Sequence, residues 1–218
     1  MILGMNRCLM ILIAPLSLWL ALARSAPGNA QSSLELNLQS TPTLRVFVYG
    51  FSGLPPGVLQ GAESEAVRLL RPVPIEWQWI DCTGRVMPDL CQSPQLSTDL
   101  VIRLTRKALP QVSARTLGIA GSSAEYATAF LFYDRVLALR TQTRLLPAML
   151  GRVLAHEITH LLLPQEEHAQ LGLMRAHWSV EDLQGTSTAC LGLSTRSIQL
   201  MYGEALRRVR ASRRAREQ

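Results

Sequence analysis

Charged and aromatic residues are scarce in this sequence: charged side chains make up 17% of the 218 residues and aromatic side chains 6%. Apolar residues make up 48%, enough to build the core of one ordinary domain, so the composition excludes long disorder as the main state. The chain also lacks an internal repeat and a long low-complexity linker. We therefore predict one folded domain.

A phosphate-binding loop is missing as well. The stretch 118–123 is rich in glycine and serine, but no Gly-Lys-Ser/Thr ending and no following helix accompany it. We interpret it as a turn or loop before a strand. The pattern does not favour nucleotide binding.

The excess of positive charge is confined to the ends of the chain. The net charge is +6, which by itself would suggest a nucleic-acid partner. Arg7 and Arg24 lie in the first thirty residues, and six arginines fall in the last twelve: Arg207, Arg208, Arg210, Arg213, Arg214 and Arg216. Between residues 31 and 206, 14 basic residues balance 15 acidic ones. We therefore expect no nucleic-acid partner, and a helix over 197–213 whose end carries a solvated arginine run.

The first thirty residues have the pattern of a secretory signal peptide. An apolar run from Cys8 to Ala23 follows Arg7 and precedes small residues and turn formers. Its sixteen residues fall short of the roughly 20 that cross a bilayer as a helix, although an uncleaved anchor is the alternative. We expect a secreted or periplasmic protein with no stable membrane partner. The predicted divisions are a signal peptide (1–30), a polar leader (31–43), a folded domain (44–206) and a basic tail (207–218).

Three cysteines remain after residue 30. Cys82 and Cys91 bracket a loop whose glycine and proline are able to bring the sulfurs together, so we predict a disulfide in this oxidising context. Two buried thiols, or half of a metal site, are the alternatives. We expect Cys190 to be a free, partly buried thiol.

Alternating strands and helices indicate an α+β domain. Apolar residues at helical spacing predict a helix over 58–70, ended by Pro72 and Pro74. Residues of strand composition predict strands at 44–49, 75–80, 100–104 and about 127–139.

The four histidines of the chain lie between positions 156 and 177, and two of them form the pattern His-Glu-x-x-His. His156 and His160 are four residues apart, so on a helix both imidazoles lie on one face and are able to converge on one zinc ion. Glu157 then reaches the metal-bound water instead of the metal. Apolar residues surround this segment almost completely, and we expect a core helix that starts between Thr143 and Pro147 and ends near Leu163.

This pattern resembles that of the zincin metallopeptidases, and more narrowly the metzincins, whose motif is His-Glu-x-x-His-x-x-Gly-x-x-His followed by a methionine-bearing turn. It is also similar to uncharacterised secreted bacterial proteins with a comparable motif and a Gly-Ile-Met-like turn. The resemblance covers about two dozen residues. It implies a single zincin-like α+β domain, in which a small mixed sheet packs on helices and a central helix bears the motif.

Two departures from the metzincin motif concern the third metal ligand. Leu163 replaces the glycine, and the next histidine, His168, arrives two residues late. A break at Pro164 and a longer loop would carry His168 to the metal, which gives the ligand set His156, His160 and His168. Glu166 or Glu167 is the alternative third ligand.

The resemblance implies hydrolysis of a peptide bond in a peptide or protein substrate. Zinc lowers the pKa of its water toward about 7 and polarises the carbonyl, while Glu157 acts as general base and then protonates the leaving amine. The strand around 130–133 is the expected place for edge pairing with the substrate.

Four further residues near the motif have candidate roles. Met174 is either the turn methionine beneath the ligands or an ordinary core residue, and Trp178 is expected to pack against that turn. His177 is a solvent-exposed group, a substrate-side group or, least favoured, a ligand. Tyr202 and Arg175 are candidates for oxyanion stabilisation, although no spacing establishes this.

A second class of function stays open at this point. A zinc-containing extracytoplasmic binding or structural protein would keep the ligands without turnover. Glu157 argues against it, because a purely structural metal site does not need a general base. The missing glycine at Leu163 favours it slightly.

Overall fold

The computed structural model describes residues 41–51, 53–84, 86–92, 96–123, 126–164, 168–185 and 191–217, which belong to one compact unit, Thr41–Gln218. The predicted signal peptide, Glu166, Glu167 and Cys190 lie outside the described residues. Within the described part, no helix combines the length and the apolar character that a bilayer crossing requires.

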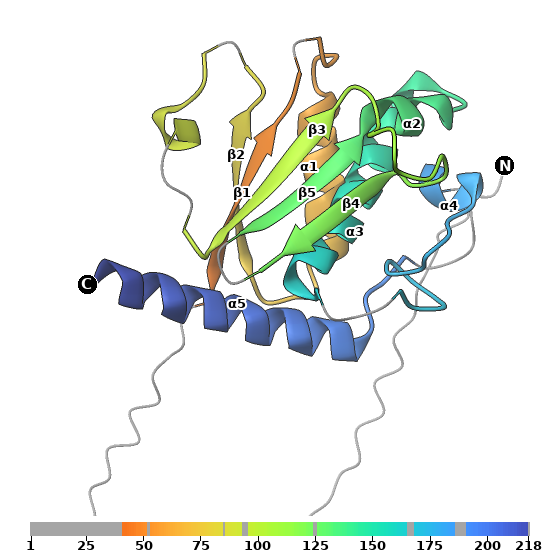
Figure 1. Cartoon of the computed structure of the whole chain (residues 1–218). Helices are drawn as coiled ribbons and strands as arrows, with labels where there is room; N and C mark the ends of the chain where they lie inside the picture. The colour runs from red at the N-terminus through yellow and green to blue at the C-terminus, as the bar shows by residue number, and fades with distance from the viewer. Residues whose placement is uncertain are drawn as a thin grey trace, which may run out of the picture. The chain divides into compact units, whose positions relative to one another are not determined.

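Five strands form one mixed sheet in the described part of the chain, in the order β2-β1-β3-β5-β4 (Figure 1). The four strands β2, β1, β3 and β5 are parallel, and β4 runs antiparallel to β5 along one edge. Their bounds are β1 Thr43–Tyr49, β2 Glu76–Cys82, β3 Asp99–Thr105, β4 Gly118–Ser122 and β5 Ala127–Phe132.

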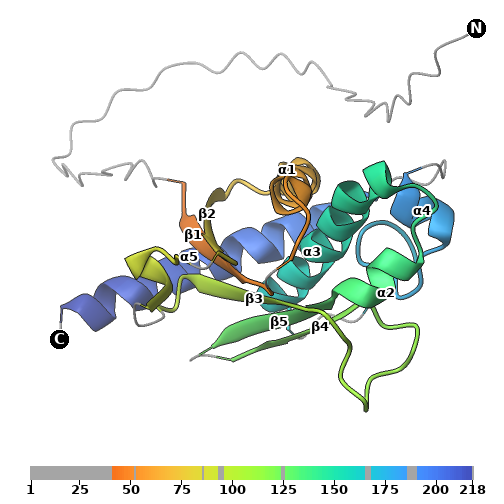
Figure 2. The ribbon, with the colours of Figure 1, turned by 90° about the horizontal axis from the view of Figure 1, so that it is seen from above.

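The long helices α1 and α3 cover the same face of the sheet, as the view from above shows (Figure 2). Helix α5 crosses the lower end of the strands in Figure 1. The predicted helix over 58–70 and the predicted motif helix are both confirmed. The helices are α1 Val58–Leu70, α2 Tyr133–Ala138, α3 Leu146–Leu162, α4 Val180–Gln184 and α5 Thr195–Arg216, with short 3-10 turns η1 at Asp89–Gln92 and η2 at Thr143–Leu145.

Helices α1 and α3 approach each other closely because a glycine lies at their contact. A β-carbon added to Gly151 of α3 would lie 2.5 Å from the carbonyl oxygen of Ala62 in α1. With glycine there, the two backbones come together above the buried strand residues. The core between these helices and the sheet includes Leu44, Val46, Leu100, Ile102, Ala129, Leu131, Leu150, Leu154 and Ile158.

A smaller cluster lies around Phe47, Ile80 and Cys82, apart from the main core. Cys82, at the end of β2, forms a disulfide with Cys91 in the η1 turn, so that predicted pairing is confirmed. The bond ties the loop after β2 to this cluster, where Tyr49 also donates a hydrogen bond to the Cys91 carbonyl oxygen.

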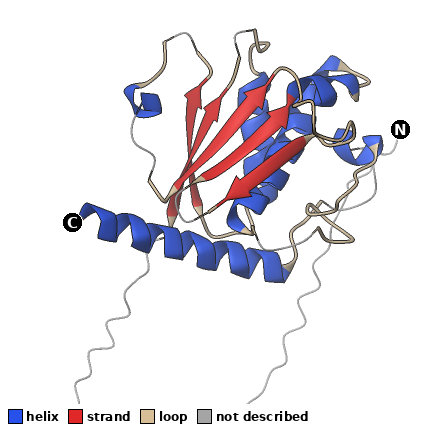
Figure 3. Ribbon diagram, viewed as in Figure 1, coloured by secondary structure: helices blue, strands red, loops and turns tan. Residues whose placement is uncertain are grey.

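Two element predictions are wrong. The stretch 118–123, interpreted as a turn or loop, forms the edge strand β4, because its backbone pairs with β5 despite its low strand propensity. The strand predicted over 127–139 ends at Phe132, and the chain continues as α2 (Figure 3). The apolar residues of this stretch do not reveal by their spacing alone where a strand gives way to a helix.

The basic C-terminal segment is part of the fold. Helix α5 continues through the predicted boundary at 206, and the side chain of Arg208 is 4% exposed. It pairs with Glu204 at 2.8 Å and donates hydrogen bonds to Ser122 Oγ and to the carbonyl oxygens of Ser97 and Leu161. The expectation of a solvated arginine run is therefore wrong at Arg208, while Arg213, Arg214 and Arg216 are exposed.

Candidate metal centre

Helix α3 places His156 and His160 on one face, as their spacing predicted. Pro147 lies in the first turn, where its missing N–H costs no helical hydrogen bond, and the helix ends at Leu162 shortly before Pro164. The buried face of α3 fixes the rotation of the helix about its axis. Both imidazoles are consequently half-buried and lie beside the edge strand β4.

The ring nitrogens of three histidines converge. The Nε2 atom of His160 lies 3.1 Å from Nε2 of His156 and 3.1 Å from Nε2 of His168. Potential ligand atoms of these three side chains all lie within 4.8 Å of one another, and among the described residues they form the only group of this kind. His168 thus reaches the face of α3 despite its two-residue delay, and the arrangement can hold a metal ion.

The orientation of His156 is fixed by a backbone carbonyl. Its Nδ1 atom lies 2.7 Å from the carbonyl oxygen of Leu173. A carbonyl oxygen only accepts, so Nδ1 carries the hydrogen and, in a neutral ring, Nε2 keeps a free lone pair directed at the other histidines. Such a bond from the far ring nitrogen is the usual support of a metal-binding histidine.

A tight turn brings the Leu173 carbonyl and His168 to the helix. Gly172 adopts φ 80°, and a β-carbon there would lie 2.4 Å from the Gly192 carbonyl oxygen. Next to His168, the Ala169 N–H donates to the Met174 carbonyl oxygen at 2.7 Å. The backbone of this turn therefore links the third histidine to the segment that orients the first.

Burial keeps two of the histidines neutral. It lowers the pKa of His156 to about 4, against a smaller opposing effect of the hydrogen bond to Leu173. Burial also lowers the pKa of His160 to about 4, helped by the neighbouring His156 and His168. Neutral imidazoles keep the lone pairs that metal binding requires.

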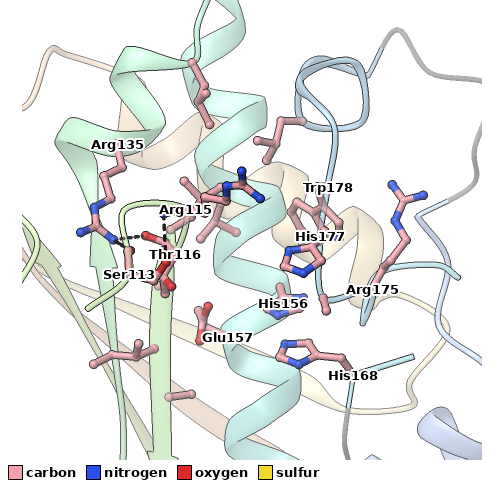
Figure 4. A pocket seen from close by; sticks show the side chains of 18 of the residues that line it. Ser113, Arg115, Thr116, Arg135, His156, Glu157, His168, Arg175, His177 and Trp178 are labelled. Atoms are coloured by element: carbon pink, nitrogen blue, oxygen red, sulfur yellow. Dashed lines mark hydrogen bonds between the residues drawn. The ribbon is translucent and has the colours of Figure 1, made fainter. Parts of the chain in front are cut away.

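Glu157 lies between α3 and the edge strand (Figure 4). It is 4% exposed, and burial raises the pKa of its carboxyl to about 8. Gly118, the first residue of β4, faces it so closely that an added β-carbon would lie 2.6 Å from Oε1. The edge strand and the motif helix therefore confine the carboxyl group beside the histidines.

A cavity of about 1340 Å³ opens above these side chains. One wall comes from the segment leading into β4 and from β4 itself, and the opposite wall comes from the segment after Met174 (Figure 4). His156, Glu157, His160 and His168 all contribute to the lining. The cavity is large enough for several residues of an extended peptide.

Of the other candidate residues, some line the cavity and some belong to the core. His177 is exposed and lines the cavity, but it does not belong to the three-histidine group. Arg175 also lines the cavity and pairs with Asp182, whereas Tyr202 packs on the core and is not among the lining residues described. Met174 is buried.

Trp178, expected to pack against the turn, contacts the candidate ligand His156. Its ring meets that of His156 edge to face, with centroids 5.2 Å apart. Its indole nitrogen is buried and has no hydrogen-bond partner in the part of the chain that the structure describes.

Sequence reasoning missed the Leu173 carbonyl and Gly118. A backbone carbonyl carries no side-chain signal, and Gly118 belongs to the stretch interpreted as a loop. The proximity of both to the motif arises only when distant segments come together.

Known structures share this fold. The chain aligns with the crystal structure of archaemetzincin from Methanopyrus kandleri at 15% identity and a TM-score of 0.50, over 78% of this chain and 99% of that one. It aligns with a zinc-dependent peptidase from Methanocorpusculum labreanum at 10% identity and a TM-score of 0.52, over 72% of this chain and 99% of that one. The chain has a metzincin-like zincin fold. No protein-family model matches it, and no curated protein sequence does.

The zincin fold accounts for the order of the elements around the site. The motif helix α3 follows the strands and packs against one face of the sheet, with the antiparallel edge strand beside it. The predicted α+β class, the small mixed sheet and the central motif helix are confirmed. At these identities the likeness concerns the fold alone.

Proposed function

We propose that this chain is an exported zinc-dependent peptidase in which His156, His160 and His168 hold Zn²⁺ and Glu157 is the general base. The observation that carries the proposal is the convergence of three Nε2 atoms beside a buried carboxyl group. The zincin fold and the open cavity over the site support the same reaction class.

The histidine spacing fits zinc. With zinc–nitrogen distances of about 2.0–2.1 Å, two ligands of a tetrahedral site lie about 3.3 Å apart. The two Nε2–Nε2 separations of 3.1 Å, from His160 to His156 and to His168, are close to this value. Hydrogen bonds alone explain the two short contacts of His160 less well. A neutral His160 has at most one hydrogen on Nε2, and two neighbouring Nε2 atoms would have to share it.

When bound, Zn²⁺ supplies Lewis-acid chemistry, which polarises a carbonyl group and makes water acidic near neutral pH. Burial alone raises the pKa of Glu157 to about 8, and the positive charge of a bound Zn²⁺ would favour its ionised form. As a carboxylate, Glu157 would accept a proton from water and deliver it to the leaving amine, because it lies next to the ligand His156 and lines the cavity. Its buried setting excludes bulk water from that exchange. The Leu173 carbonyl holds the His156 ring in place.

The substrate is a peptide or protein segment in extended form. The prediction that the strand around 130–133 pairs with it is wrong, because β5 lies between β3 and β4. The sheet edge next to the site belongs to β4, which contributes Gly118, Ile119 and Ala120 to the cavity wall. Backbone pairing along β4 would place a scissile bond near Glu157.

Export is proposed from the N-terminal pattern, with support from the Cys82–Cys91 disulfide, which is typical of oxidising compartments. Expression in a bacterium, followed by N-terminal sequencing of the periplasmic or secreted form, tests it. A new N-terminus between residues 24 and 31 is expected. An intact Met1 in a purely cytoplasmic protein would contradict export.

Metal analysis and proteolysis test the proposed activity. The purified protein should hold about one zinc per chain and cleave peptides in a chelator-sensitive way. Glu157→Gln should retain zinc and lose cleavage, and cleavage that survives this substitution would overturn the mechanism. Zinc retention in a wild-type protein that cleaves no peptide library would favour the non-catalytic zinc-binding alternative.

A further inference from the structure

In the part of the chain that the structure describes, the cavity wall carries a positive charge without a carboxylate partner. Arg115 lies in the segment before β4, is exposed and lines the cavity (Figure 4). Among the described residues, no carboxylate pairs with its guanidinium group. Arg175, from the opposite wall, is different, since Asp182 neutralises it.

The backbone around Arg115 is held in place by a second arginine. Arg135 of α2 donates hydrogen bonds to the carbonyl oxygens of Val112, Ser113 and Thr116, on both sides of Arg115. The Thr116 N–H also donates to the Ser113 carbonyl oxygen at 3.0 Å. Arg115 therefore extends from a braced loop, and less conformational freedom is lost when it binds a ligand.

The charges of the lining favour an anion. Among the described residues, the lining includes a single carboxyl group, Glu157, and two arginines without a carboxylate partner, Arg115 and Arg135, besides Arg175, which pairs with Asp182. The hydrogen bonds of Arg135 go to uncharged carbonyls, so they leave its charge uncompensated. A cleft with a net positive lining concentrates negative groups.

We propose that Arg115 is a specificity-determining residue that binds a carboxylate of the substrate close to the scissile bond. Arg115 precedes Gly118 by three residues, which span at most about 11 Å, or about three residues of an extended peptide. The carboxylate belongs to an acidic side chain or to the free C-terminus of the peptide, since both present the same two oxygens to a guanidinium group. This inference rests on the proposed peptidase function.

A binding experiment tests the inference separately from turnover. Fluorescently labelled, alanine-rich octapeptides are titrated into the full chain carrying Glu157→Gln. One set carries Asp at one position at a time with an amidated C-terminus, a second carries a free C-terminus and no acidic residue, and a third carries Asn with an amidated C-terminus. We expect at least one carboxylate-bearing peptide to bind about tenfold more tightly than its amide counterpart.

Reversal of charge identifies the residue. Arg115→Glu, in the same background, should abolish the preference for the carboxylate. Arg71→Glu, at an exposed position outside the cavity lining, changes the net charge equally and should preserve it. Tighter binding of the Asp peptides would assign the carboxylate to an acidic side chain, and tighter binding of the peptide with a free C-terminus would assign it to the peptide end.

Equal binding of carboxylate and amide peptides, no binding of either, or equal effects of the two arginine substitutions would overturn the inference. Cleavage by the wild-type protein without such a preference would overturn it and leave the proposed function intact. Peptide binding with the preference but no cleavage by the wild type would overturn the peptidase function and leave the role of Arg115 standing.

Discussion

Gly118 of the edge strand and Glu157 of the motif helix are in such close contact that no other side chain fits between them. An added β-carbon would lie 2.6 Å from Oε1 of Glu157 and 2.8 Å from its Cδ. The glycine lets the backbone of β4 run against the carboxyl group, so the strand that borders the cavity also limits where the proposed general base can lie.

Gly118→Ala should therefore displace Glu157. We expect kcat to fall on the order of 10–100-fold, because small displacements of a catalytic group cost that much, while the zinc content stays at one per chain. Gly121→Ala on the same strand is the matched control, since its β-carbon would meet only Tyr126 Cε2 at 3.9 Å. Equal activities of the two variants, measured on one peptide substrate, would contradict the positioning role.

Zinc should stabilise the fold through His160, the central member of the histidine group. A ligand that binds the folded chain at 100 times its Kd adds about 2.7 kcal/mol to stability. A chelator should therefore lower the Tm of the wild-type protein, and His160→Ala should show a lower Tm without any response to the chelator. His177→Ala is the control and should respond as the wild type does. A chelator response retained by His160→Ala would refute the site.

Arg208 should contribute far more to stability than its neighbour Arg207. Arg208→Ala leaves the carbonyl oxygens of Ser97 and Leu161 without this buried donor, and we expect a loss of about 2–4 kcal/mol. Arg207→Ala removes an exposed pair with Glu204 and should cost less than about 1 kcal/mol. Urea unfolding of both variants measures the difference, and similar losses would contradict the anchoring role of Arg208.

Glu63 should make stability fall as the pH rises. Burial, with a smaller effect from Asp81, raises the pKa of its carboxyl to about 7, and Oε1 is buried with no partner among the described residues. In the unfolded chain the carboxyl ionises near its ordinary pKa of about 4.3. Between these values the folded state binds more protons than the unfolded one. The free energy of unfolding therefore falls as the pH increases from about 4.3 to about 7.

Glu63→Gln removes that titration. Its free energy of unfolding should exceed that of the wild type by more at pH 8 than at pH 5, as measured by urea unfolding at both values. Glu217→Gln, at the exposed end of α5, is the control for the loss of a negative charge. A difference between Glu63→Gln and wild type that is the same at both pH values would contradict the prediction.

Local patterns in the sequence predicted much of the fold. Apolar spacing placed α1 and α3, and strand composition placed β1, β2 and β3, because these periods report directly which side chains are buried. The edge strand β4 escaped prediction. Its Gly118-Ile-Ala-Gly-Ser sequence has little strand character of its own, and pairing with β5 supplies the missing stabilisation.

For the candidate site, the four-residue spacing of His156 and His160 was enough to place both on one helix face with Glu157 beside them, because spacing within one helix fixes direction. It left the third histidine open. His168 meets them through tertiary packing, since the turn at Gly172 and the hydrogen bond from the Ala169 N–H to the Met174 carbonyl oxygen join segments that no local period connects. Contacts between distant segments depend on packing and backbone pairing, which short-range spacing does not encode.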